Sequence, residues 1–359
     1  MARPARYVEV ADNVARDLAA WHRGRPSTSE TYLVMRRLHQ LTAGWSSRTI
    51  RTAMRVTPWA VDRLGSEHRS PASPSVAEAV PELRREGLAS LAPVLSEAEI
   101  ASLAEFARRA PAIARHANGR RTPGTYESDR ESASAIFVEG RFAWARPEVQ
   151  RVLADPQVWA VAREYFGMVP VIQPPQLYWT CVDADVDAAT AVSLARNYHW
   201  DYDGIGSLRL VVYLTDVDEG SAPMEYVTGS HRAGALRTRE LRYADEGDTP
   251  PEALATLGLS HGTPMLGPAG STFITDAFGL HRANPARTHD RLVMIVPMQA
   301  GSFAGYYQRA RRVPVRDPRF ADALAAGRPE LRLFRPGDPA ERVVTLADDE
   351  RAGSGAVAV

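Results

Sequence analysis

The spacing of apolar residues changes along this chain, and the change restricts the available folds more than any other feature. In residues 5–22 and 28–64, apolar side chains recur at helical spacing with few glycines or prolines between them. From about residue 133, short apolar stretches follow one another, separated by clusters of Gly, Pro and Asp and interrupted by a helical stretch near 147–165. Helices followed by many short strands favour an α+β fold whose strands form a barrel or a sandwich.

Several elements can be placed individually. We expect strands over residues 171–182, 197–202, 208–215, 224–228, 271–276 and 292–298. Ser96 and Glu99 form a capping-box pattern that predicts a helix beginning at Glu97, with a short strand over 89–92 before it. The long polar segment 231–267 is expected to be an insertion between strands, where functional loops are common.

Two residue counts exclude whole classes of chemistry. All 43 basic residues are arginine, so lysine Schiff-base catalysis and the nucleotide sites that need a lysine are excluded. The single cysteine, Cys181, cannot make an intrachain disulfide, a four-thiolate zinc site or an iron–sulfur cluster, and its apolar neighbours favour burial. A metal site must therefore be built mainly from histidine and carboxylate ligands.

Charge and hydropathy are those of an ordinary globular protein. The 43 basic residues balance 43 acidic ones, and no apolar stretch approaches the ~20 residues that span a bilayer. The N-terminus has no apolar signal-peptide core, so we expect a cytoplasmic protein with no membrane or nucleic-acid partner. Residues 1–68 hold 11 arginines against six acidic residues, which indicates either a face for an acidic partner or a solvated helix surface.

The segment Asn197-Tyr-His-Trp-Asp201 carries the strongest chemical signal. In extended chain, residues two apart point to the same side, so His199 and Asp201 can reach one metal ion while Trp200 faces away. Alone, such a pair is also typical of ordinary strands and loops. His281, 80 residues after Asp201, completes two histidines and one carboxylate, a set that suits non-haem Fe(II) with positions open for O2 and a chelating co-substrate.

Arg291 lies ten residues beyond His281, at the start of the apolar stretch RLVMIV. A guanidinium binds a carboxylate through a bidentate, charge-assisted pair. The far carboxylate of 2-oxoglutarate requires such a partner when its keto-acid end binds iron.

Four stretches together resemble the phytanoyl-CoA dioxygenase family of Fe(II)/2-oxoglutarate oxygenases. They are LRREGLASLAPVLSEAEIASL (83–103), YHWDYD (198–203), GSAPMEYVTGSH (220–231) and DAFGLHRANPARTHDRLVMIV (276–296). The resemblance implies a double-stranded β-helix, a jelly-roll or cupin-like core, with helices packed outside it and an extra N-terminal helical segment.

The same resemblance assigns roles to individual residues. It implies that the catalytic iron ligands are His199, Asp201 and His281, and that Arg291 binds 2-oxoglutarate. Gln176 and Tyr178, on one face of the strand before the His-x-Asp motif, would add co-substrate contacts, although packing roles for this pair are an alternative.

The expected organisation has three parts. Residues 1–75 form a helical N-terminal extension, residues 76–345 the oxygenase domain and residues 346–359 a flexible tail. We expect the substrate pocket between the N-terminal helices, the 231–267 insertion and the mouth of the barrel.

The expected function is the hydroxylation of an unactivated C–H bond in a small, biosynthetic molecule, with Fe(II) as cofactor and 2-oxoglutarate and O2 as co-substrates. Arginines of the insertion would bind a carboxylate, phosphate or carrier group of that substrate, or would be surface charge; they are Arg232, Arg237, Arg239 and Arg242. Two alternatives remain: a metal-dependent cupin isomerase or epimerase, and a binding protein that kept the fold without turnover. The pattern leaves the oligomeric state open.

Overall fold

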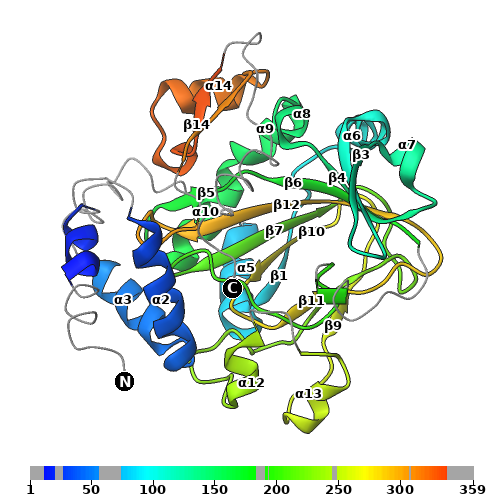
Figure 1. Cartoon of the computed structure of the whole chain (residues 1–359). Coiled ribbons are helices and arrows are strands. Elements are labelled where there is room, and N and C mark those ends of the chain that lie inside the picture. The colour runs from blue at the N-terminus through cyan, green and yellow to red at the C-terminus, as the bar shows by residue number, and fades with distance from the viewer. Residues whose placement is uncertain are drawn as a thin grey trace.

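The computed structural model describes residues 12–20, 27–55, 74–182, 191–192, 194–244, 249–306 and 309–337. In these residues, helices pack against one face of a nine-stranded antiparallel sheet. A three-stranded antiparallel sheet lies against part of the opposite face (Figure 1). The fold is therefore α+β, with the two facing sheets of a double-stranded β-helix that do not join into a closed barrel. No helix of the described ranges has the length and apolar character needed to cross a membrane.

The elements are as follows. The strands are β1 (Leu88–Leu91), β2 (Ala112–His116), β3 (Arg121–Gly124), β4 (Ala133–Val138), β5 (Pro170–Ile172), β6 (Gln176–Thr180), β7 (Ser207–Tyr213), β8 (Met224–Tyr226), β9 (Thr263–Met265), β10 (Thr272–Asp276), β11 (His281–Ala283), β12 (Arg291–Ala300), β13 (Arg311–Val313) and β14 (Phe334–Pro336). The helices are α2 (Ser29–Leu41), α3 (Trp45–Arg55), α5 (Pro74–Glu86), α6 (Glu97–Arg109), α7 (Tyr126–Asp129), α8 (Gly140–Ala143), α9 (Pro147–Leu153), α10 (Pro156–Phe166), α12 (Arg239–Arg242), α13 (Ala253–Thr256), α14 (Pro318–Ala325) and the 3-10 helix η3 (Pro329–Leu331).

The large sheet has the strand order β1-β10-β7-β12-β6-β4-β2-β3, and β5 also pairs with β12. Its two faces differ because successive side chains of a strand alternate. On β12, Leu292 and Met294 face the helices and join the main core, whereas Val293 and Ile295 face the small sheet. We call the side toward the small sheet the inner face and the helix side the outer face.

The outer face is the main hydrophobic core. Helices α5, α6 and α10 contribute to it, and each fully buried leucine there, such as Leu83 or Leu210, stabilises the fold by about 1.5–3 kcal/mol. Helix α6 begins as predicted: Ser96 Oγ accepts from the Glu99 amide, and Glu99 Oε2 accepts from the Ser96 amide at 2.8 Å. The capping box thus fixes where the helix starts.

The N-terminal helices lie beside the core (Figure 1). The helical segment expected over 28–64 contains two helices, because α2 and α3 are separated by a turn in which Ala43 and Gly44 have φ of 48° and 86°. Residues 56–64 of that prediction lie outside the described residues. Helix α2 is tied to the core by the Tyr32 hydroxyl, which donates to the backbone oxygen of Tyr202 at 3.0 Å.

Most predicted strands are confirmed, with two exceptions. The strand over 171–182 is divided into β5 and β6, because the segment Gln173-Pro174-Pro175 interrupts it. The strand over 197–202 is wrong: only two isolated bridges occur, Tyr198 with Thr249 and His199 with His281. A continuous ladder needs a neighbour of equal length, and β11 offers three residues.

Candidate metal centre

Backbone pairing brings together three side chains that are far apart in sequence. His199 and His281 exchange both backbone hydrogen bonds, at 3.0 and 2.8 Å, and the Asp201 amide donates to the Ala277 oxygen at 2.7 Å. The two imidazole rings consequently lie with their centroids 4.4 Å apart. The short bridge therefore performs the positioning that we expected of a regular strand.

The potential ligand atoms of His199, Asp201 and His281 all lie within 4.8 Å of one another. His281 Nε2 is 3.4 Å from Asp201 Oδ2, and His199 Nε2 is 4.0 Å from Asp201 Oδ1. It is the one cluster of His, Cys, Asp and Glu with this geometry in the part of the chain that the structure describes. Two histidines and one carboxylate on one side of a centre leave the opposite positions open.

The tautomers of both histidines are fixed by their own chain. Nδ1 of His199 lies 3.0 Å from the Asn197 carbonyl oxygen, and Nδ1 of His281 lies 2.9 Å from that of Gly279. Each Nδ1 must donate its proton to that oxygen, so each Nε2 presents a lone pair to the centre. Metal-binding histidines are oriented in this way in proteins.

The charges suit a divalent cation. Burial, together with the neighbouring His281, lowers the pKa of His199 to about 4, so the ring is neutral near pH 7. Burial opposes the charge of Asp201, but the Arg209 guanidinium and His281 hold the pKa of this carboxyl well below its usual range. The centre thus combines neutral imidazole nitrogen with an ionised carboxylate.

Arg209, on the inner face of β7, holds the Asp201 carboxylate in place. Its Nη2 donates to Asp201 Oδ2 at 3.0 Å, and its Nη1 donates to Asp203. Ser207 Oγ donates to the same oxygen of Asp203 at 2.7 Å, which fixes the second carboxylate in turn. With Oδ2 bound to Arg209, Oδ1 of Asp201 remains available as a ligand atom.

Arg291 begins β12 on the inner face and has no exposed surface. Its Nη1 donates to the Ala222 oxygen and its Nη2 to Thr180 Oγ1 at 3.1 Å, while its buried Nε has no hydrogen-bond partner in the described ranges. No carboxylate of the described residues lies within 4.0 Å of this guanidinium. A buried charge without a counter-ion is costly, so the site suits a carboxylate brought by a ligand.

A hollow of about 210 Å³ opens on the same inner face. Gln176, Tyr178 and Thr180 line it from successive inward positions of β6, and Thr180 is the cross-strand partner of Arg291. Ala283 lines it two residues beyond His281 on β11, so the hollow extends from the triad's strand toward β6.

Two arginines are among the residues that line this hollow. Arg115 of β2 places its guanidinium 4.2 Å from the centre of the Phe137 ring, which in turn stacks on Tyr178 at 4.7 Å. Arg196 lines the hollow from the segment before the His-x-Asp motif. Two arginines and an aromatic pair therefore form part of its lining.

The sequence pattern that defines the phytanoyl-CoA dioxygenase (PhyH) family matches residues 83–293, more than half of the chain. The matched region contains the triad, Arg209 and Arg291. The chain belongs to this family. It is therefore an Fe(II)- and 2-oxoglutarate-dependent dioxygenase, as the resemblance of the sequence implied.

Individual relatives of this PhyH-family chain are distant. The ectoine dioxygenases of Bordetella parapertussis and Bordetella bronchiseptica are each 27% identical over 235 residues, which cover 58% of this chain and 70% of the relative. Among solved structures, the epimerase SnoN from nogalamycin biosynthesis has 16% identity and a TM-score of 0.45, and covers 62% of this chain and 82% of its own. HygX from Streptomyces hygroscopicus, solved with nickel and 2-oxoglutarate, has 14% identity and a TM-score of 0.45, covering 74% and 96%.

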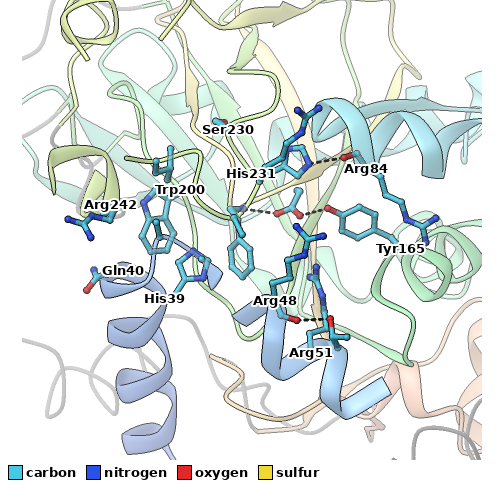
Figure 2. Close-up of a pocket in the computed structure, with 18 of the residues that line it drawn as sticks. His39, Gln40, Arg48, Arg51, Arg84, Tyr165, Trp200, Ser230, His231 and Arg242 are labelled. Atoms are coloured by element: carbon cyan, nitrogen blue, oxygen red, sulfur yellow. Dashed lines mark hydrogen bonds between the residues drawn. The ribbon is translucent and has the colours of Figure 1, made fainter. Parts of the chain in front are cut away.

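The structure places every residue singled out from the sequence of this family member. His199, Asp201 and His281 come together, Arg291 is buried beside Thr180, and Gln176 and Tyr178 line the adjoining hollow. Trp200 points to the other side of the motif, toward a separate cavity (Figure 2). Cys181 is fully buried.

Sequence reasoning missed Arg209, Thr180, Arg115 and Arg196. Two of them had a signal in the alternation of their strands: Thr180 continues the row of Gln176 and Tyr178, and Arg209 precedes the inward Val211 and Tyr213. The expected location of the pocket also differs. Strands β2, β4 and β6 line the hollow beside Thr180 and Ala283, whereas the N-terminal helices and Arg232 and Arg242 of the insertion surround the separate cavity.

Proposed function

We propose that this enzyme hydroxylates an unactivated C–H bond of a small molecule, with iron held by His199, Asp201 and His281. The observation that carries the proposal is the triad on the same inner face as Arg291, a buried guanidinium without a carboxylate partner among the described residues. The far carboxylate of 2-oxoglutarate would pair with Arg291.

The donor set fits the metal and the co-substrate. Two imidazoles and one carboxylate are the ligands expected for non-haem Fe(II), and Arg291 supplies the charge and the buried Nε that a carboxylate would satisfy. Iron bound here, with 2-oxoglutarate and O2, would supply the oxidising power to break a C–H bond while 2-oxoglutarate becomes succinate and CO2.

The protein's own residues would orient the reactants. Thr180 and the Ala222 oxygen hold the Arg291 guanidinium in one orientation, and Arg209 does the same for the Asp201 carboxylate. Gln176 and Tyr178 lie between Arg291 and the rim, where they would contact the co-substrate. Side chains fixed before binding lower the cost of reaching reactive geometry.

Arg115 and Arg196 indicate the substrate's chemistry. Both line the hollow where it meets the inner strands, so a substrate with a carboxylate or phosphate group fits best. The Bordetella relatives are named for a reaction on ectoine, which is in keeping with a small-molecule substrate. That this small molecule is a biosynthetic intermediate is part of the proposal.

The three-part division of the chain belongs to this proposal as well. Helices α2 and α3 precede the family match, which begins at residue 83, and this supports residues 1–75 as an extension of an oxygenase domain at 76–345. Residues 346–359, expected to form a flexible tail, lie outside the described residues.

The test is an anaerobic titration of the Fe(II)-loaded protein with 2-oxoglutarate, monitored by the visible metal-to-ligand charge-transfer band. A saturable band is expected for the parent protein, no band for Asp201→Ala, and a band at higher 2-oxoglutarate concentration for Arg291→Lys and Arg291→Ala. Arg237→Gln, on an exposed residue, serves as the matched control.

The same experiment separates the alternatives. An isomerase or epimerase that does not use 2-oxoglutarate would bind iron without the band. A binding protein without turnover would show the band, yet would not convert 2-oxoglutarate to succinate under air with any candidate substrate. Either result in folded, iron-loaded protein would overturn the proposal.

A further inference from the structure

A second cavity, of about 300 Å³, lies behind the metal centre. Helices α2 and α3 form one side of it, and α5, Tyr165 of α10 and the segment after β8 form the others (Figure 2). Trp200 and Phe278 give it an apolar wall, while His199, Asp201, His281 and Arg291 do not line it. It shares no lining residue with the hollow bordered by Gln176, Tyr178 and Thr180, so the two are distinct.

Arginine dominates the lining of this cavity. Six arginines line it, contributed by α3, α5 and the insertion: Arg48, Arg51, Arg55, Arg84, Arg232 and Arg242. The one carboxylate among the lining residues, Asp276, is already engaged, since it accepts from the Tyr165 hydroxyl and, at 2.9 Å, from the Phe278 amide. The cavity thus has a large excess of positive charge.

The arginines are held in place without being neutralised. Arg55 donates to the Phe166 and Tyr165 oxygens at 2.6 and 3.0 Å, and Arg242 donates to the Leu41 oxygen at 3.3 Å. Arg232 likewise donates to a backbone oxygen, that of Arg85. Backbone carbonyls fix the direction of a guanidinium but leave its charge uncompensated.

These six arginines also form few ion pairs. Within the described ranges, Arg84 alone of the six has a carboxylate within 4.0 Å, that of Glu164 at 3.2 Å, and both side chains are at least half exposed. Nη1 of Arg51 is buried and has no hydrogen-bond partner among the described residues. Like charges gathered this closely repel one another, and an anion would remove that cost.

We propose that this cavity binds a phosphate group, either as inorganic phosphate or as part of an organic phosphate. Its arginines belong to three separate elements on different sides of the cavity, which suits a tetrahedral dianion with several acceptor oxygens better than a planar carboxylate. The bound phosphate would join α3 to the insertion and to α5. This inference does not depend on the proposed function.

The experiment measures binding of inorganic phosphate to the full chain, by calorimetry and thermal unfolding, with chelator present so that the metal centre plays no part. Sodium chloride at matched ionic strength controls for screening, and 2-oxoglutarate controls for a simple dicarboxylate. We expect saturable phosphate binding with a rise in unfolding temperature, and no comparable rise with either control. A small organic phosphate, phosphopantetheine, distinguishes the two sources: tighter binding than phosphate assigns the group to a larger ligand.

Variants locate the binding. Arg51→Gln and Arg232→Gln should each weaken phosphate binding at least tenfold, and Arg237→Gln, an exposed arginine of the same insertion that does not line the cavity, should not. Arg48→Gln, on an exposed residue of α3, provides a variant in which misfolding is not expected, and it should weaken binding in the same direction. Phosphate effects matched by chloride, or lost equally in Arg237→Gln, would overturn the proposal.

Discussion

Replacing Arg209 with glutamine tests whether this guanidinium positions the Asp201 carboxylate for metal binding. The substitution removes the bond from Nη2 to Asp201 Oδ2, which is 3.0 Å long, and the contact with Asp203. Asp201 then has a rotatable carboxylate at the centre, and its ionised form loses a neighbouring cation. We expect weaker iron binding with the fold retained.

The magnitude follows from the lost interaction. A hydrogen bond between charged groups contributes about 1.5–3 kcal/mol, and the 34% exposure of the Asp201 side chain argues for the lower half of that range. At about 1.4 kcal/mol for each factor of ten, the iron dissociation constant should rise roughly 10- to 30-fold. Loss of a group that orients a metal ligand typically weakens metal binding by about 10- to 100-fold, and the value expected for Arg209→Gln lies in this range.

The assay is an anaerobic Fe(II) titration against a competing chelator, at saturating 2-oxoglutarate, with the visible band as the readout. Arg209→Lys should give an intermediate affinity, because it keeps the charge but loses the planar fork. Arg237→Gln is the control for charge removal alone. Iron affinity of folded Arg209→Gln within about twofold of the parent would refute the argument that Arg209 positions Asp201.

Three further substitutions test the structure around the site. Thr180→Val removes the acceptor of Arg291 Nη2, so the 2-oxoglutarate dissociation constant should rise about 3- to 10-fold in the band titration, from the loss of about 0.5–1.5 kcal/mol. Ser96→Ala removes the capping box with Glu99 and should lower the free energy of unfolding by about 0.5–2 kcal/mol in denaturant. Leu210→Ala, at a fully buried outer-face position, should lower it by about 2–5 kcal/mol.

Each of these expectations has a result that would contradict it. Unchanged 2-oxoglutarate affinity in Thr180→Val would mean that the hydroxyl does not hold Arg291 in its binding orientation. An unchanged free energy of unfolding in Ser96→Ala would mean that the capping box does not stabilise the fold. Full stability of Leu210→Ala would place that side chain outside the main core.

The sequence predicts the centre well because few residues carry it. A histidine and a carboxylate two residues apart, a distant second histidine and an arginine ahead of an apolar strand are local patterns. Each alone also fits an ordinary structural role, but together they fit one metal and co-substrate site. The capping box at Ser96 is local too, and α6 begins where it predicts.

What the sequence does not predict depends on contacts between distant segments. Arg115 reaches the hollow because β2 pairs with β4 and β4 with β6, and no local pattern specifies that order. The segment 197–202 has the composition of a strand, yet its pairing is set by β11, which is three residues long. The turn at Ala43 and Gly44 requires left-handed backbone at both residues, and an alanine in the sequence does not predict that conformation.

Residues 199–201 lie between the metal centre and the arginine-lined cavity, and this arrangement would link their occupants. His199 and Asp201 face the metal centre, whereas Trp200 lines the arginine cavity and packs against His39 of α2, with ring centroids 4.8 Å apart. A phosphate bound between α3 and the insertion would lie on the side of residues 199–201 that faces away from the metal centre. Linkage makes any such effect reciprocal: if phosphate tightens iron binding, iron must tighten phosphate binding by the same factor. Measuring both affinities, each with and without the other ligand, therefore provides an internal check, since unequal factors would show that two processes, rather than one coupled site pair, had been measured.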